Sequence, residues 1–295
     1  MKLTDKQIAI FAAVTAIILG GGVTTLSKIA LRDIPVFGFT FLRFFCASLV
    51  ILPYFLKNRP KIQKDFYKVL LFSLFLSVNV LIFPIGVRLT TATIGQTLYV
   101  FVPIITALAS YFLLSEIFSA RKITGVFVGL LGALVIILLP EITKGAPFAG
   151  NLQGNFIIFL GVIAVAFYTV LSKKFQKQYT PFQINALFIF LTTILAAGLA
   201  IPELFFSSSW LQHISVGATF ATVYVGILGT AAWYLLYQYV IKHSTPLIAS
   251  MILYLQPAAT FVWASLLLGE RLTIGLLIGV ALAFTGVYLT LQAKK

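Results

Sequence analysis

A long apolar segment in the first half of the chain recurs in the second half at one fixed offset. Residues 100–136 read VFVPIITALASYFLLSEIFSARKITGVFVGLLGALVI, and residues 254–290 read YLQPAATFVWASLLLGERLTIGLLIGVALAFTGVYLT. A shift of 154 positions aligns Pro, Glu and Gly residues of the two copies, for example Glu116 with Glu270. Duplication of an apolar block is typical of secondary transporters, in which one structural repeat moves against the other.

The composition indicates that most of the chain lies in lipid. The chain is 60% hydrophobic and 9% charged, whereas a soluble domain averages about 25% charged residues. A membrane-spanning helix needs roughly 20 apolar residues. We expect ten such spans, at about 8–30, 36–56, 67–87, 93–114, 123–139, 152–171, 182–201, 216–241, 247–268 and 274–291. The predicted fold is an all-α membrane protein with ten transmembrane helices.

The longest connection between predicted spans divides the chain into two halves. It runs from Pro140 to Asn151 and contains two glycines and a further proline, as linkers often do. The halves, residues 1–140 and 152–292, are predicted to be five-helix repeats. Because five is an odd number, the second repeat enters the membrane from the opposite side, and the two repeats are predicted to be inverted.

The basic residues predict the orientation of the chain. With the N-terminus inside, 15 of the 21 Lys and Arg residues fall on the cytoplasmic side, five fall outside and Arg43 lies within a span. This bias predicts that both termini are cytoplasmic. The net charge of +14 is divided among short loops of one face, which indicates contact with anionic lipid headgroups rather than with nucleic acid.

Two segments resemble a known transporter family. Residues 266–289, LLLGERLTIGLLIGVALAFTGVYL, follow Pro257 and resemble the closing signature of EamA-type transporters in the drug/metabolite transporter superfamily. The stretch from Ile34-Pro35 to Leu42-Arg43-Phe44 resembles that family's early P…LRF segment. The resemblance covers nearly the whole chain as two EamA-type domains. It implies a ten-helix carrier of the cell inner membrane that exports small metabolites such as amino acids.

The chain also departs from the family pattern. Ser115-Glu116-Ile117 stands where the family tends to have Gly-Glu-Arg or Gly-Glu-Lys. Gly20 to Gly22 and Phe167 stand near positions where a Trp is common. Those spans line the family's cavity, so the resemblance does not identify the substrate.

Arg43 is the only charge well inside a predicted span. A charge at the centre of a bilayer costs about 2.5–3.5 kcal/mol even on a lenient insertion scale, so this side chain is expected to face protein or water. Two interpretations stay open. Arg43 either binds an anionic group or gates the pathway, or it locks a helix in place while its charged end reaches toward the interface.

Neutral polar side chains within the spans complete the predicted substrate site. Such groups can line a cavity that fixes a zwitterion or a polar head, or they can form hydrogen bonds between helices worth about 0.6 kcal/mol each. Tyr234 and Tyr237 are three residues apart, as are Gln96 and Tyr99, so each pair is expected to share a helix face. The predicted substrate-binding residues are Arg43, Asn79, Gln96, Tyr99, Tyr234, Tyr237, Gln238 and Gln256.

Glu116 and Glu270 lie next to the ends of predicted spans. Each either couples transport to protons or is a structural carboxylate paired with a base such as Arg271 or with a backbone amide. No Asp or Glu lies in the middle of a span, which argues against a buried carboxylate relay.

The predicted function is therefore secondary transport by alternating access, with export of a small metabolite such as an amino acid. A proton-coupled uptake carrier and a passive channel or facilitator remain alternatives. An enzyme would need a nucleophile–base pair or a metal cluster, and the predicted topology separates the two histidines, His213 and His243. We expect no catalytic residue, cofactor or metal. The glycines near residues 125–132 and 275–286 allow close helix contact within one chain or between two copies, so a homodimer stays open.

Overall fold

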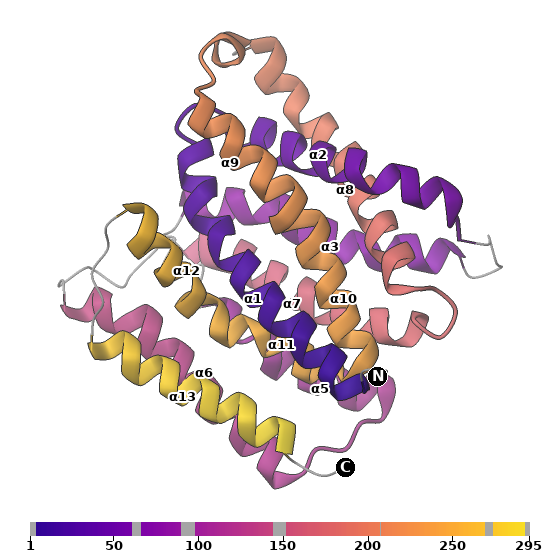
Figure 1. The fold of residues 1–295 in the computed structure, drawn as a ribbon, viewed down its shortest axis with the longest axis vertical. Coiled ribbons are helices and arrows are strands. Elements are labelled where there is room, and N and C mark those ends of the chain that lie inside the picture. Colours follow the sequence, from indigo (N-terminus) through magenta and orange to yellow (C-terminus); the bar gives the residue numbers. More distant parts are fainter. Residues whose placement is uncertain are drawn as a thin grey trace.

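A computed structural model describes residues 4–60, 66–89, 98–143, 152–206, 208–268 and 274–292, and the described part is helical (Figure 1). The helices of the first half are α1 (Asp5–Ala30), α2 (Val36–Lys57), α3 (Phe66–Leu89), α5 (Val102–Leu114) and α6 (Ala120–Thr143). Those of the second half are α7 (Leu152–Phe175), α8 (Pro181–Phe206), η1 (Ser208–Gln212), α9 (Val216–Gly226), η2 (Ile227–Ala232), α10 (Trp233–His243), α11 (Pro246–Ser250), α12 (Ile252–Leu268) and α13 (Ile274–Gln292).

Helices lie at all ten places where spans were predicted. Within the described residues, seven segments are long and apolar enough to cross a membrane. Val216–His243 joins α9, η2 and α10, and Pro246–Leu267 joins α11 and most of α12. The other three places are occupied by the shorter helix α5, by α6 and by α13. The first residues of the predicted span 93–114 lie outside the described part. The all-α architecture of a multi-pass membrane protein is confirmed.

Polar side chains satisfy the first backbone amides of the first two helices. Thr4 caps α1, since its hydroxyl accepts from the amide of Gln7 at 3.3 Å while the Gln7 side chain accepts from the amide of Thr4 at 2.9 Å. The start of α2 is capped by a carboxylate from another helix, α8. Glu203 accepts from the amides of Phe37 at 3.3 Å and Gly38 at 2.6 Å. A negative charge is favourable at a helix N-terminus, so this contact ties α8 to the start of α2.

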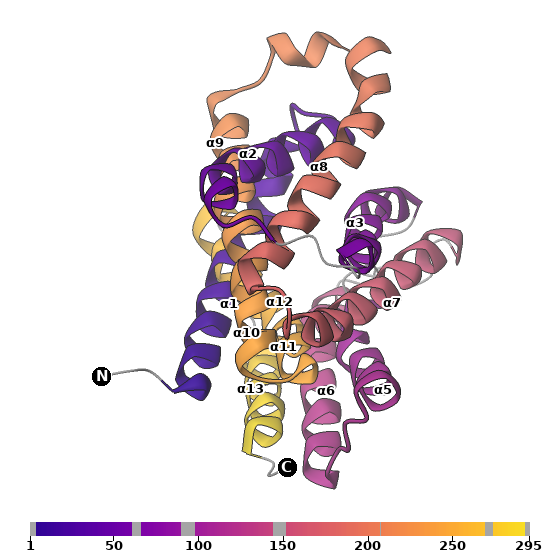
Figure 2. The same ribbon diagram turned by 90° about the vertical axis from the view of Figure 1, so that its right-hand side faces the viewer.

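The packing of helices follows a paired pattern (Figures 1 and 2). α6 packs on α13 and α2 packs on α8, so each of these helices meets the helix at the same place in the other half. Other major contacts come in pairs that are related by exchanging the two halves. The contact of α3 with α7 corresponds to that of α1 with α10. In the same way, α5 with α7 corresponds to α1 with α12, and α3 with α8 corresponds to α2 with α9. Each half therefore packs against the other in the same way.

The α6–α13 contact has local two-fold symmetry. A Cβ atom built on Gly125 would lie 2.7 Å from the carbonyl oxygen of Gly286, and one built on Gly132 would lie 2.6 Å from that of Gly279. The two contacts are exchanged by the 154-residue offset. Residue numbers rise along α6 as they fall along α13, so the helices are antiparallel. Glycine is required here because any side chain would enter the facing backbone.

A short π-helix, η2, interrupts the span that begins with α9. Two side chains support it: the Thr230 hydroxyl donates to the carbonyl of Val225 at 2.8 Å, and Asn185 of α8 donates to the carbonyl of Ala231 at 3.1 Å. π-Helical turns are rare and often lie at functional sites. Trp233 and Tyr234 directly follow η2, so this turn sets the direction of both side chains.

Candidate functional site

A cavity of about 480 Å³ lies between the two halves, with walls from α1, α2, α3, α10, α12 and the residues just before α5. Its lining is mostly apolar, with Phe39, Phe83 and Pro257 among the larger groups. The polar groups in its wall are Thr24, Ser27, Thr40, Arg43, Asn79, Tyr99, Tyr234, Gln256 and Thr260. An apolar pocket with a few convergent polar groups is the usual form of a small-molecule site.

Five of the eight predicted substrate-binding residues line this cavity. They are Arg43, Asn79, Tyr99, Tyr234 and Gln256. They come from both halves of the chain and from segments up to 213 positions apart, between Arg43 and Gln256. The fold therefore assembles them from five different helical segments.

Arg43 brings the only guanidinium into the described part of the cavity wall. The side chain is partly buried, and it interacts with the hydroxyl of Tyr234 on the other half of the molecule. Its Cζ lies 4.9 Å from the centre of the Phe44 ring. The buried Nε atom has no hydrogen-bond partner among the described residues, so this donor is unsatisfied.

Asn79 and Tyr99 form a polar pair on the α3 side of the cavity. The Asn79 amide donates to the Tyr99 hydroxyl, and the Phe83 ring meets the Tyr99 ring edge to face with centres 5.4 Å apart. The pair therefore presents a hydroxyl held by an amide and an aromatic face held by a second ring.

Gln256 presents an unused amide. Both its Oε1 and its Nε2 are buried without a hydrogen-bond partner in the described part of the chain. Leaving a buried polar group unpaired costs about 1–3 kcal/mol. Gly20 of α1 makes room for this amide, since a Cβ there would lie 2.6 Å from Nε2 of Gln256 and 2.4 Å from Nε1 of Trp233. Gln256 therefore keeps one unsatisfied donor group and one unsatisfied acceptor in the cavity wall.

Tyr237 and Gln238 lie on α10 against α7 and do not line the cavity. The Tyr237 hydroxyl is 2.9 Å from Oγ1 of Thr169. The Gln238 amide donates to the hydroxyl of Tyr168 at 2.6 Å and to that of Ser172 at 3.0 Å. All five side chains are buried. We refer to them together as the α7–α10 contact.

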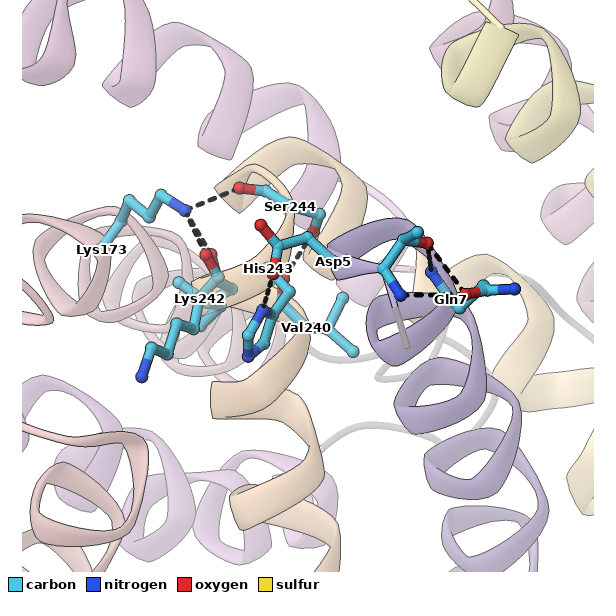
Figure 3. A network of polar contacts seen from close by, with 9 residues as sticks. Asp5, Gln7, Lys173, Val240, Lys242, His243 and Ser244 are labelled. Carbon is cyan, nitrogen blue, oxygen red and sulfur yellow. Dashed lines mark hydrogen bonds and ion pairs between the residues drawn. The ribbon is translucent and has the colours of Figure 1, made fainter. Parts of the chain in front are cut away.

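Lys173 extends the α7–α10 contact to the end of α10. Its Nζ donates to the carbonyl oxygens of Ile241 at 2.7 Å, Lys242 at 2.8 Å and Ser244 at 2.7 Å (Figure 3). The last carbonyls of a helix have no partner within that helix, and a positive charge is favourable beside them. Lys173 thus fixes α7 to the C-terminal turn of α10.

The cavity and the α7–α10 contact lie toward opposite ends of α1. Thr24, Ser27 and Leu31, at or just beyond the last two turns of α1, line the cavity. The first turn carries Asp5, whose Oδ1 lies 2.7 Å from Nδ1 of His243 at the end of α10 (Figure 3). The cavity therefore belongs to the end with the α1–α2 connection, while polar contacts hold the other end together.

The remaining predicted residues lie apart from the cavity or outside the described part. Glu116 follows α5 and Ser115, whose left-handed φ of 53° ends the helix. Gln96, Glu270 and Arg271 lie outside the described residues. Whether Glu116 or Glu270 couples transport stays a prediction.

The prediction missed the hydroxyl residues Thr24, Ser27, Thr40 and Thr260 in the cavity wall. Threonine and serine are common in apolar helices because their hydroxyls can bond the helix's own backbone, as Thr40 does to the carbonyl of Val36 at 2.8 Å. Their positions in the sequence therefore carry no signal that separates a cavity wall from a helix interior.

The carboxylates nearest the α1–α2 connection already have partners. Glu203 caps α2, and Asp33 accepts from the amide of Ser215 at 2.9 Å and from its hydroxyl at 2.5 Å. These hydrogen bonds lower the pKa of Asp33. Among the described residues, no group of three His, Cys, Asp or Glu side chains could hold a metal ion.

Comparisons with known proteins agree with the fold and show the family. The sequence model of the EamA-like transporter family matches residues 7–138 and 152–292. The uncharacterized transporter YetK of Bacillus subtilis is 27% identical, covering 99% of this chain and 90% of its own length. A WAT1-related protein of Arabidopsis thaliana is 25% identical over 97% of this chain and 88% of its own. A crystal structure, 19% identical and covering 95% of both chains, has the same fold with a TM-score of 0.80.

Proposed function

Because the chain belongs to the EamA-like transporter family, we propose that it is a secondary transporter of the cell inner membrane that exports a small metabolite, such as an amino acid, by alternating access. One observation carries the proposal. A cavity with convergent polar groups lies between the two halves at one end of the helices, while the α7–α10 contact closes the other end. This is the arrangement expected of a carrier open to one side.

The inverted repeat is the basis of this mechanism. The two-fold contact between antiparallel α6 and α13 supports it, as does the matched packing of the other helices. If α6 and α13 both cross the membrane, their two-fold axis lies in the membrane plane, as inversion requires. Each repeat can then adopt the conformation of the other, and the two states differ by no more than a few kcal/mol.

The α7–α10 contact has a counterpart in the cavity wall. Leu26-Ser27-Lys28 of α1 recurs as Leu171-Ser172-Lys173 of α7, 145 positions later. By this offset Thr24 corresponds to Thr169 and Ser27 to Ser172, so the residue type is the same within each pair.

The partners on α10 correspond to residues of α3. The 154-residue offset places Tyr237 on Phe83 and Gln238 on Pro84. Phe83 and Pro84 line the cavity, as do Thr24 and Ser27. We infer that the second state forms when α1 closes on α3 as α7 now closes on α10. In that state Lys28 caps the end of α3, as Lys173 caps the end of α10.

Cysteines at the equivalent serines test this exchange. In a Cys46→Ser background, Ser27→Cys is expected to react with a membrane-impermeant maleimide added outside, because Ser27 lines the cavity. Ser172→Cys is expected to react only from the cytoplasmic side and more slowly, since Ser172 is buried. Labelling of both positions from both sides at once would indicate a channel and contradict the alternating-access carrier.

The two lysines supply a matched pair of controls for the labelling. Lys173→Ala removes three hydrogen bonds from the α7–α10 contact, so it is expected to increase labelling of Ser172→Cys. Lys28→Ala is expected to decrease that labelling, because it weakens only the other state. The same response to both substitutions would contradict the proposed exchange.

The topology prediction is tested at two positions. Fluorescent-reporter fusions after Asn151 and Lys295 are expected to report an outside location for residue 151 and a cytoplasmic location for the C-terminus. The reason is the bias of 15 basic residues against five. The same side for residues 151 and 295 would contradict five spans in the second half and would remove the inverted repeat.

A further inference from the structure

The charges around the cavity are unbalanced. Arg43 contributes a guanidinium to the wall, while none of the described lining residues is acidic. The whole chain has seven Asp and Glu residues. The two beside the α1–α2 connection, Asp33 and Glu203, are bonded to Ser215 and to the start of α2. A cationic ligand group would therefore meet no free carboxylate in the described wall, whereas an anionic group would meet Arg43.

The unused hydrogen-bonding atoms lie on two residues of the same wall. The buried Nε of Arg43 and both amide atoms of Gln256 have no partner among the described residues. Arginine holds a carboxylate through its planar donors better than any other side chain. The Gln256 amide can accept from a neighbouring hydroxyl or donate to a carboxylate oxygen. Both residues thus present what a carboxylate and an adjacent polar group require.

The rest of the wall fits an apolar body. Phe39, Phe83, Pro84, Leu253 and Pro257 line the same cavity. Its volume of about 480 Å³ is in the range of small-molecule sites. Burying an apolar group there is favourable, whereas burying a second charge without a partner is costly.

From this geometry we infer that the transporter selects a monocarboxylate with an apolar body. Arg43 binds the carboxylate, and an ammonium group on the substrate weakens binding. The inference rests on the cavity being the transport site. It narrows the proposed substrate from small metabolites in general to carboxylates without an ammonium group, so the amino acids given above as an example would bind more weakly. An ammonium group loses its hydration in this cavity and gains only neutral acceptors such as the Gln256 amide oxygen and aromatic faces such as that of Tyr99, with no opposite charge among the described lining residues.

Four compounds with one carbon skeleton test the inference. They are 3-phenyllactate (anion), phenylalanine (zwitterion), 3-phenyllactamide (neutral) and phenylalaninamide (cation). Binding is measured by titration calorimetry with the purified full-length protein in lipid nanodiscs. We expect phenyllactate to bind at least about tenfold more tightly than either amide, as one charge-assisted hydrogen bond can provide. We also expect it to bind more tightly than phenylalanine. Absence of phenyllactate binding, or equal or tighter binding of any of the other three, would overturn the inference.

Two variants identify the residue responsible. Arg43→Gln removes the charge and is expected to abolish the preference of phenyllactate over phenyllactamide. Arg32→Gln makes the same change in net charge at an exposed residue outside the cavity wall and is expected to leave the preference intact. A preference that survives in a folded Arg43→Gln protein would assign the selectivity to another group and overturn the inference.

A different measurement would refute the proposed function. Counter-flow in proteoliposomes measures transport, whereas the titration measures only binding. Carboxylate-selective binding without counter-flow would refute the carrier and leave the inferred selectivity in place. Counter-flow of a solute without any preference for the carboxylate would refute the selectivity and leave the carrier in place.

Discussion

Replacing Arg43 with alanine is expected to reduce transport at least about tenfold, because the substitution removes the only guanidinium from the described wall of the cavity. It also removes the partner of the Tyr234 hydroxyl on the other half. Arg43→Lys keeps the charge but loses the planar set of donors. It is therefore expected to restore transport only partly.

The measurement is the initial rate of transport by equal amounts of protein in the membrane. Arg32→Ala provides the matched control, since Arg32 is exposed and lies outside the cavity wall. Normal transport by Arg43→Ala at normal membrane levels would show that the group only locks a helix, the alternative that the sequence leaves open.

The second large effect is expected at the α6–α13 contact. A Cβ at residue 132 would lie 2.3 Å from the backbone nitrogen of Ala283 and 2.6 Å from the carbonyl oxygen of Gly279. Both are backbone atoms, so the helices must separate to accept even a methyl group. We expect Gly132→Ala to destabilise the protein by about 1–3 kcal/mol, the usual cost of overpacking.

Gly198→Ala is the matched control for this substitution. Gly198 lies inside α8, and a Cβ there has nothing within 4 Å. Alanine is a better helix former than glycine by about 1 kcal/mol, so this variant is expected to be neutral or slightly stabilised. Thermal unfolding in detergent compares the two, and equal melting temperatures would show that α6 and α13 are not closely packed.

The sequence predicts the positions of the helices well. The predicted spans at 36–56 and 152–171 begin at the same residues as α2 and α7, because long apolar runs bounded by charged loops allow few other arrangements. The sequence does not predict how two spans are broken. The predicted span 216–241 contains η2, and the span 247–268 is divided at Met251.

A tertiary contact explains why the break at η2 escapes prediction. The carbonyl of Ala231 at η2 bonds to Asn185, a residue 46 positions earlier on α8. Local sequence does not report such a partner. Pro257 has no backbone N–H group, so the carbonyl of Leu253, one turn earlier in α12, loses its usual helical partner. Both residues line the cavity.

Prediction of the candidate site from the sequence has the same limit, because it depends on tertiary contacts. Helical periodicity predicts that Tyr234 and Tyr237 share a face, yet Tyr234 lines the cavity while Tyr237 lies in the α7–α10 contact. The sequence marks both as polar residues within a span, but which neighbour each one meets depends on the packing of α10. Composition therefore selects the candidates, and only the fold separates those that face the cavity from those that close it.

The α7–α10 contact closes the present state, and an α1–α3 contact is inferred to close the second state. The difference between these two contacts has a kinetic consequence. Tyr237 and Gln238 hydrogen-bond to α7, whereas the side chains of their counterparts, Phe83 and Pro84, have no donor or acceptor to offer α1. Three hydrogen bonds between membrane helices at about 0.6 kcal/mol each favour the present state by more than tenfold. If both termini are cytoplasmic and the protein exports its substrate, as proposed, the empty carrier rests with its cavity toward the outside. Its return to the cytoplasmic side is then expected to limit the rate, and exchange of solute across the membrane to run faster than net export.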